Sequence, residues 1–177
     1  LPDIENPRPI SPQGIIDYHT ELRWIQVKNV DIAQVCCDAV IEIVKSAQPE
    51  IAFADLTCIV DHAEIGKKIV LLLSQKKIYC IDTFSKEDQG SRRKKLAFFK
   101  GDGRVKVTTL HSFKGWETRA LVVQLSKADS LEALALFYTG ITRLKRNDNG
   151  SYLTVVCGAT ELEEFGKTWP YFNEISS

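Results

Sequence analysis

Several absences narrow the classes of protein to which this chain of 177 residues can belong. No apolar run approaches the roughly 20 residues that a membrane helix needs, and no charged-then-apolar leader opens the chain. The 23 basic and 23 acidic side chains leave no net charge. Methionine is absent and the first residue is a leucine, which suggests an excised segment of a longer protein. We therefore expect one ordinary soluble domain.

Cysteine is present but lacks the patterns of disulfide or metal frameworks. The five cysteines are an odd number without C-x-x-C spacing, and all but one lie in apolar, regularly patterned segments: Cys36, Cys37, Cys58, Cys80 and Cys157. This predicts reduced, buried thiols in a cytoplasmic protein. Cys36 and Cys37 are adjacent on one predicted helix and are not expected to share a face. His19 and His62 have no partner at metal-ligand spacing, so no metal site is predicted.

Proline is scarce except at the beginning of the chain. Four of the six prolines fall within the first fourteen residues, a density that denies regular structure. We therefore assign residues 1–22 to a proline-rich lead-in or linker and residues 23–177 to the folded domain.

The apolar pattern predicts an α/β domain. Apolar residues recur at helical spacing over residues 32–44, with Asp31 or Asn29 as the cap, and again over residues 65–73 and 130–144. Between these helices lie short apolar runs at residues 56–60, 78–81, 105–110, 120–125 and 152–157. Strands that are apolar throughout must be buried on both sides. We therefore predict three layers, with a mostly parallel sheet covered by helices on both faces.

A basic segment interrupts this pattern. Residues 86–106 hold eight basic side chains against three acidic ones, a local net charge of +5 (8 − 3). Such a run suits contact with phosphates. It is equally typical of a solvated helix face.

The segment after the predicted strand at 105–110 carries the first set of candidate functional residues: Thr109, His111, Ser112, Lys114, Gly115, Trp116 and Glu117. Strand ends followed by hydroxyl, lysine and glycine residues are where open α/β sheets usually bind ligands. Trp116 lies inside this loop, where an aromatic ring could stack on a base, although a core position is the alternative for each tryptophan of the chain. On its own, this loop is also compatible with an ordinary surface loop.

The second set closes the predicted helix at 130–144. Lys145 and Arg146 are explained by the preference for cations at a helix C-terminus. Arg143 lies between Ile141 and Leu144, both apolar, so packing is expected to hold its stem while its planar guanidinium faces a fixed target such as phosphate.

Together the two segments resemble motifs V and VI of the UvrD-like superfamily 1 helicases. The first matches Thr, any, His, Ser, any, Lys, Gly, any, Glu, and the second, about twenty residues later, matches a helix ending in Gly, apolar, Thr, Arg. The second match consists of Tyr138, Gly140, Ile141, Thr142 and Arg143. The resemblance covers residues 56–158.

The resemblance implies a second RecA-like domain, which closes over ATP and Mg²⁺ that a first, N-terminal RecA-like domain holds. Arg143 would be the arginine finger on the γ-phosphate, Glu117 would bind the ribose, and Gly115 would lie near the phosphates. The other loop residues would face single-stranded DNA: Thr109, His111, Ser112, Lys114 and Trp116. We accordingly expect Arg143 and the whole of residues 109–117 to meet along one edge of the sheet.

The sequence departs from the family pattern in three ways. It has no G-x-x-x-x-G-K-[ST] loop and no acidic metal-binding motif, so the chain alone is predicted not to hydrolyse ATP. The arginine expected of motif IV is missing, and Lys67 is the candidate to replace it. The accessory domain is absent or reduced to the basic segment. Two alternatives remain: a catalytically inactive, helicase-like module that binds nucleic acid or protein, and an unrelated flavodoxin-like nucleotide-binding domain.

Overall fold

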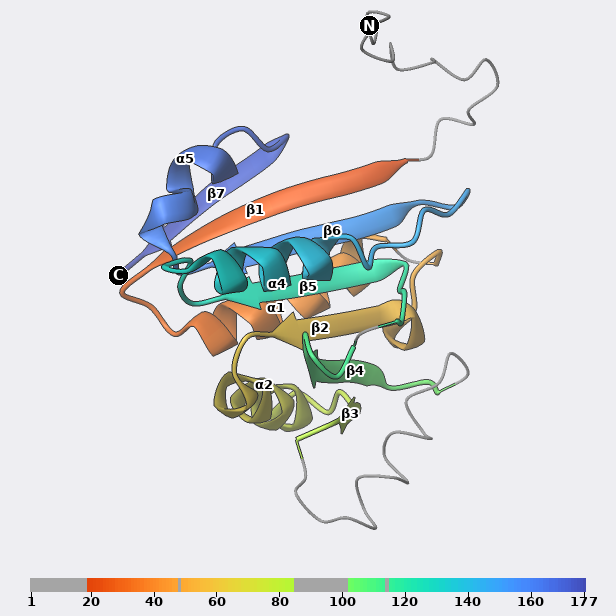
Figure 1. Cartoon of the computed structure of the whole chain (residues 1–177). Helices are drawn as coiled ribbons and strands as arrows, with labels where there is room; N and C mark the ends of the chain where they lie inside the picture. Colours follow the sequence, from red (N-terminus) through yellow and green to blue (C-terminus); the bar gives the residue numbers. More distant parts are fainter. Residues whose placement is uncertain (1–18, 48, 85–101, 114) are drawn as a thin grey trace, which may run out of the picture.

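The fold is built on one seven-stranded parallel sheet (Figure 1). The computed structural model describes residues 19–47, 49–84, 102–113 and 115–177. Within these residues the strand order is β3-β4-β2-β5-β6-β1-β7, and every neighbouring pair of strands is parallel. Helices cover both faces, which confirms the predicted three-layer α/β architecture. None of the described helices is long and apolar enough to cross a bilayer.

The strands and helices alternate along the chain. The strands are β1 (Thr20–Lys28), β2 (Leu56–Val60), β3 (Cys80–Asp82), β4 (Val105–Thr109), β5 (Ala120–Leu125), β6 (Ser151–Cys157) and β7 (Tyr171–Ser176). The α-helices are α1 (Ile32–Ser46), α2 (Ala63–Gln75), α4 (Leu131–Ile141) and α5 (Glu163–Gly166), with short 3₁₀ turns at Phe53–Asp55 and Thr160–Leu162.

Most of the predicted elements are present, with shifted ends. The helix expected to run to residue 144 ends at Ile141, so Arg143 follows the helix instead of lying in its last turn. The pattern assigns no strand to β1 or β7, and the proposed lead-in boundary at residue 22 falls inside β1. Asp31 caps α1 by accepting a hydrogen bond from the backbone N–H of Ala33.

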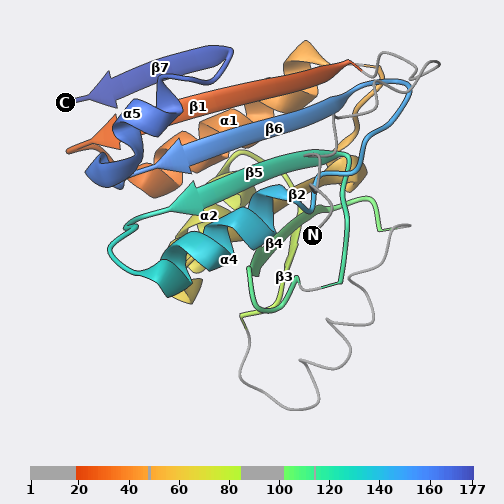
Figure 2. The same ribbon diagram turned by 45° about the horizontal axis from the view of Figure 1, so that its top comes forward.

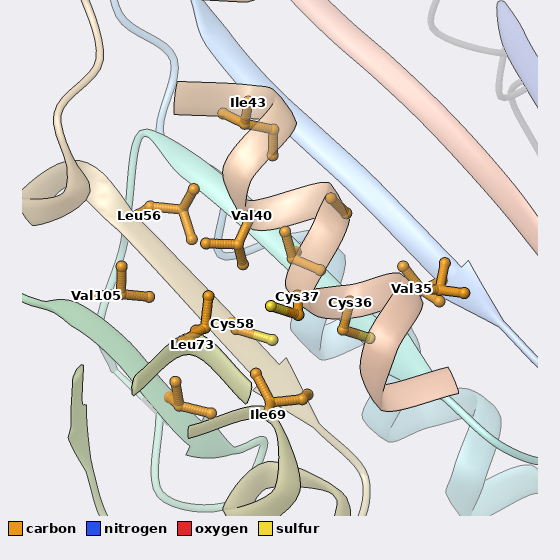
Figure 3. Packing of buried hydrophobic residues seen from close by; sticks show 14 of the residues in the cluster. Val35, Cys36, Cys37, Val40, Ile43, Leu56, Cys58, Ile69, Leu73 and Val105 are labelled. Carbon is orange, nitrogen blue, oxygen red and sulfur yellow. The ribbon is translucent and has the colours of Figure 1, made fainter. Parts of the chain in front are cut away.

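One face of the sheet is covered by α1 and α2 (Figure 2). Cys36 and Cys37 are both fully buried, as predicted, because α1 contacts the sheet and α2 at once and so buries more than one side of the helix. Figure 3 shows both thiols beside Cys58 of β2. Burial raises the pKa of Cys37 to about 11 and that of Cys36 well above its usual range. All five cysteines are free, four of them buried and Cys80 partly so, and a buried thiol with a raised pKa is a poor nucleophile.

The opposite face is covered by α4 and α5. Trp24 of β1 is completely buried there, and its ring makes edge-to-face contacts with Phe137 of α4 and with Phe165 and Trp169 at the C-terminal end. This aromatic cluster ties the outer strands β1 and β7 to the helix that precedes Arg143.

A glycine allows α4 to lie close to the segment that follows β4. A Cβ at Gly140 would come within 2.6 Å of a methyl group of Leu110, so a larger residue at this position would require the Leu110 side chain to move. The helix and the functional loop are thereby in direct contact.

We predict that Gly140→Val lowers the free energy of unfolding by about 1–3 kcal/mol, because overpacking forces the helix and the loop apart. Urea denaturation measures the effect. Ala135→Val, at an exposed position of the same helix, is the matched control and should cost only about 0.5 kcal/mol through helix propensity. Equal losses in the two variants would contradict the close approach.

Candidate functional site

The loop predicted to form one site spans two opposite edges of the sheet. Thr109 ends β4 and pairs with Val60 at the C-terminal end of β2, whereas Ala120 begins β5 and pairs with Leu56 at the N-terminal end of β2. Residues 110–118 therefore cross the sheet on the face that α4 covers. Phe113 anchors the crossing, since it is buried in the cluster beneath α4. The expectation that residues 109–117 and Arg143 share one edge is wrong for the first half of the loop.

The second half of the loop does meet Arg143. The backbone N–H of Thr118 donates to the carbonyl of Arg143 at 3.0 Å, and the N–H of Lys145 donates to the carbonyl of Thr118 at 2.7 Å. Thr118 thus forms a parallel bridge with Leu144. Gly115 and Glu117 precede this bridge and are exposed. Gly115 has φ +87°, a backbone conformation that favours glycine.

Arg143 is partly buried and has no carboxylate partner among the described residues. Its Nε donates to the carbonyl of Thr139 at 3.1 Å and its Nη2 lies 3.4 Å from the hydroxyl of Thr142. A guanidinium has five N–H donors, so this arrangement fixes the stem and leaves donors for an anion. The guanidinium is held by hydrogen bonds to the last turn of α4, where the sequence had suggested apolar packing of the stem.

A cavity of about 250 Å³ opens beside this bridge. Trp116, which is 37% exposed, lies here beside Glu117, at the opposite edge from Thr109 and His111, with which the sequence grouped it. The other lining residues come from the starts of β2 and β4, the segments that precede β2 and β5, and the segment after Arg143: Ala54, Asp55, Thr57, Lys106, Phe113, Thr118, Arg119, Lys145 and Asn147. The arrangement combines an aromatic ring, carboxylates and cations at one sheet edge.

Lys106 is a site residue that sequence reasoning missed, because it was counted with the basic segment. It belongs to β4 and is only 6% exposed. Its Nζ donates to the carbonyl of Ala54 at 2.8 Å and lies 3.5 Å from the carbonyl of Asp102. Burial lowers the pKa of Lys106, against the opposing effect of Asp102 and Asp55. The sequence feature that could have identified it is a lysine within an otherwise uncharged strand.

The lowered pKa of Lys106 predicts a pH dependence of stability. Between the folded pKa and the unfolded value of 10.5, the unfolded chain binds more protons, so the free energy of unfolding rises with pH. The wild type should therefore gain stability relative to Lys106→Met as the pH rises toward 10.5, and the difference should level off above it. Urea denaturation of both proteins from neutral to alkaline pH measures this, and parallel curves would contradict it.

Thr109, His111 and Ser112 lie at the C-terminal edge. The hydroxyl of Thr109 donates to the hydroxyl of Ser112 at 3.2 Å, and the backbone N–H of Ser112 donates to the carbonyl of Thr109 at 3.1 Å. This tight turn leaves the His111 side chain exposed. These three residues form a polar surface separate from the cavity beside Arg143.

The structure does not bring Lys67 to either group. Lys67 lies on α2, across the sheet from α4, where its Nζ pairs with Glu64 at 2.8 Å (Figure 2). Helix α2 leaves the C-terminal end of β2 toward the face that carries α1, so its exposed side cannot face Arg143. Lys114 and most of the basic segment, residues 85–101, are outside the described residues.

Comparisons with known proteins support the fold. No protein-family model matches the sequence, and no curated protein matches it. Among solved structures, the Mss116p DEAD-box helicase domain 2, bound to an RNA duplex, superposes with a TM-score of 0.58 at 14% identity, over 89% of this chain. This chain therefore spans 64% of that one.

Two other structures superpose over 88% of this chain. The C-terminal domain of the DEAD-box protein Dbp5 does so with a TM-score of 0.55 at 15% identity, over 89% of its own length. The C-terminal domain of a possible DNA helicase from Lactobacillus plantarum WCFS1 gives 0.50 at 14% identity, over 84% of its length. At these identities the likeness establishes a RecA-like fold and no more.

The residues at the N-terminal edge suit part of a nucleotide. Arg143 offers guanidinium donors for phosphate oxygens and Glu117 offers an acceptor for hydroxyl groups. Among the described residues, no group of three or more His, Cys, Asp and Glu side chains is arranged to hold a metal ion.

Proposed function

We propose that this chain is the second RecA-like domain of an ATP-dependent superfamily 1 DNA helicase of the UvrD-like type. In this proposal ATP and Mg²⁺ are held mainly by an N-terminal RecA-like domain of the same protein, and this chain closes over them. The observation that carries the proposal is the parallel bridge between Thr118 and Leu144, which brings Glu117 close along the chain to Arg143, whose guanidinium has no carboxylate partner among the described residues.

The outer side of α4 supports a docking role for the same face. Its sequence is apolar, yet only Phe137 and Gly140 are buried. Leu131 is 84% exposed and Tyr138 67% exposed, and Leu134 lies between them on the same side. A row of exposed apolar side chains at helical spacing is typical of a surface that another domain covers. Because α4 leads directly into Arg143, a domain docked on this row would bring its nucleotide close to the guanidinium.

The assignment to the UvrD-like type rests on the spacing of the motif residues, since the solved neighbours are mostly DEAD-box domains. The one described with an RNA duplex is a second helicase domain, which supports nucleic acid as the ligand class. Thr109, His111 and Ser112 are the surface residues that we assign to a single strand. They lie on the opposite edge from Arg143, so strand and nucleotide occupy separate places on this domain.

The chemistry assigned to this chain is electrostatic. In this proposal, the negative charge on the γ-phosphoryl group of bound ATP is redistributed as that group is transferred during hydrolysis. Arg143 meets that charge with a cation whose position Thr139 and Thr142 already fix, so little reorganisation is needed. Glu117 accepts hydrogen bonds from the ribose. An arginine finger of this kind is worth roughly 10³ to 10⁵ in rate.

In the full-length protein, Arg143→Ala should lower ATP turnover by about 10³-fold or more and leave ATP affinity nearly unchanged, because the guanidinium acts mainly on the transition state. Steady-state hydrolysis and equilibrium binding of a fluorescent ATP analogue measure the two effects. Arg146→Ala, three residues further along and exposed, is the matched control and should keep turnover. Unchanged turnover in Arg143→Ala would remove the finger assignment.

The 177-residue chain alone should not hydrolyse ATP, because the sequence lacks a phosphate-binding loop and an acidic metal motif. Turnover by this chain would overturn the half-site proposal.

A binding module without hydrolysis is the second candidate. The position of Lys67, far from Arg143, favours it, because the phosphate contact expected of motif IV is missing. Salt-sensitive binding of single strands that ATP does not change, together with inactive full-length protein, would select this candidate.

A further inference from the structure

A second cavity, of about 370 Å³, opens at the C-terminal edge of the sheet on the face of α4. It adjoins the turn that carries His111 and is separate from the cavity beside Arg143. Its volume lies within the roughly 300–1,000 Å³ that small-molecule sites span.

The topology makes this edge a natural binding crevice. Strands β2 and β5 are neighbours in the sheet, but the chain leaves β2 for α2 on one face and leaves β5 for α4 on the other (Figure 2). Ligands of open α/β sheets bind outside the carboxyl ends of the strands, where successive connections diverge in this way. Asp61 and His62 supply the wall after β2, and Leu125 and Lys127 supply the wall at the end of β5.

The lining pairs an apolar floor with a polar rim. Leu110, Leu125 and Leu136 provide flat apolar contact. Asp129 and Glu132 stand exposed on the rim.

Asp61 is already engaged within the protein. Its Oδ2 accepts the N–H of Ser126 at 2.6 Å and its Oδ1 lies 2.9 Å from Nδ1 of His62. Apart from this contact with His62, Oδ1 is buried and has no hydrogen-bond partner among the described residues, whereas the carboxylates of Asp129 and Glu132 stand exposed on the rim.

These charges favour a neutral ligand over a phosphate. Among the described residues, Lys127 is the only lysine or arginine that lines the cavity, so the carboxylates outnumber it. A nucleobase has apolar faces for the leucine floor and is uncharged. An exocyclic amino group on its edge would donate to a carboxylate, as cytosine donates to Asp or Glu.

We infer that this cavity binds one unstacked nucleobase that carries an exocyclic amino group, such as cytosine or adenine. The inference rests on the proposed function, because the base belongs to the single strand assigned to Thr109 and His111. The phosphates of that strand lie outside the cavity. The carboxylates of Asp129 and Glu132 select the amino-bearing edge, and thymine, with a carbonyl in the corresponding position, is disfavoured.

The test is equilibrium binding of fluorescent oligodeoxynucleotides to the 177-residue chain at fixed salt, followed by anisotropy. Oligo(dC), oligo(dT) and an abasic strand of equal length carry the same phosphates. Oligo(dC) should bind about fivefold or more tightly than oligo(dT), as one good base contact provides, and the abasic strand should bind weakest.

Two variants examine the cavity itself. Ala133→Trp fills it and should reduce the affinity for oligo(dC) to that for the abasic strand, whereas Ala135→Trp, on the exposed side of α4 and not in the cavity, should not. The double variant Asp129→Asn, Glu132→Gln should equalise oligo(dC) and oligo(dT), even if it raises the affinity for both by removing negative charge.

The outcomes separate this inference from the proposed function. Equal binding of all three strands by the wild type, or unchanged preference in Ala133→Trp, overturns the base pocket and leaves a strand track based on phosphates. Failure to bind any strand overturns both the pocket and the assignment of Thr109 and His111.

Discussion

The pairing of Thr118 with Leu144 is the constraint on which the candidate site depends. It joins a loop and a helix end that are separated in sequence, through two backbone hydrogen bonds that require no particular side chain. The side chain of Thr118 strengthens the junction by donating to the carbonyl of Asp55 at 2.7 Å. Arg143 therefore owes its position to the backbone around it, while its guanidinium remains available for an anion.

The central strands of the sheet were predictable because strands that are buried on both faces are apolar along their whole length. β2 and β5 are runs of apolar residues with nearly no exposed surface, and their predicted limits agree with the structure. β1 and β7 were not predictable in the same way. β7 is an edge strand with charged and polar residues, and β1 begins with half-buried polar residues next to a proline-rich stretch. Their position depends on the cluster that Trp24 of β1 forms with Phe137, Phe165 and Trp169, which lie far from β1 in sequence.

The sequence supplied candidate residues for the site but did not reveal their arrangement. Motif spacing singled out Thr109, Glu117 and Arg143, yet spacing along a chain does not reveal that the intervening residues traverse a whole strand length. Phe113 sets the path of the loop because its side chain packs beneath α4. The sequence does not reveal this packing, since it shows only one phenylalanine within a polar loop. Lys106 was not identified from the sequence, because its charge suggested an exposed position on the surface.

The crossing loop also has a structural consequence. Its two ends reach opposite rims of the sheet, and its middle is clamped by Phe113 against the core and by Leu110 against Gly140. The exposed turn at His111 and the exposed Glu117 are therefore joined by one short segment that is anchored in the core between them.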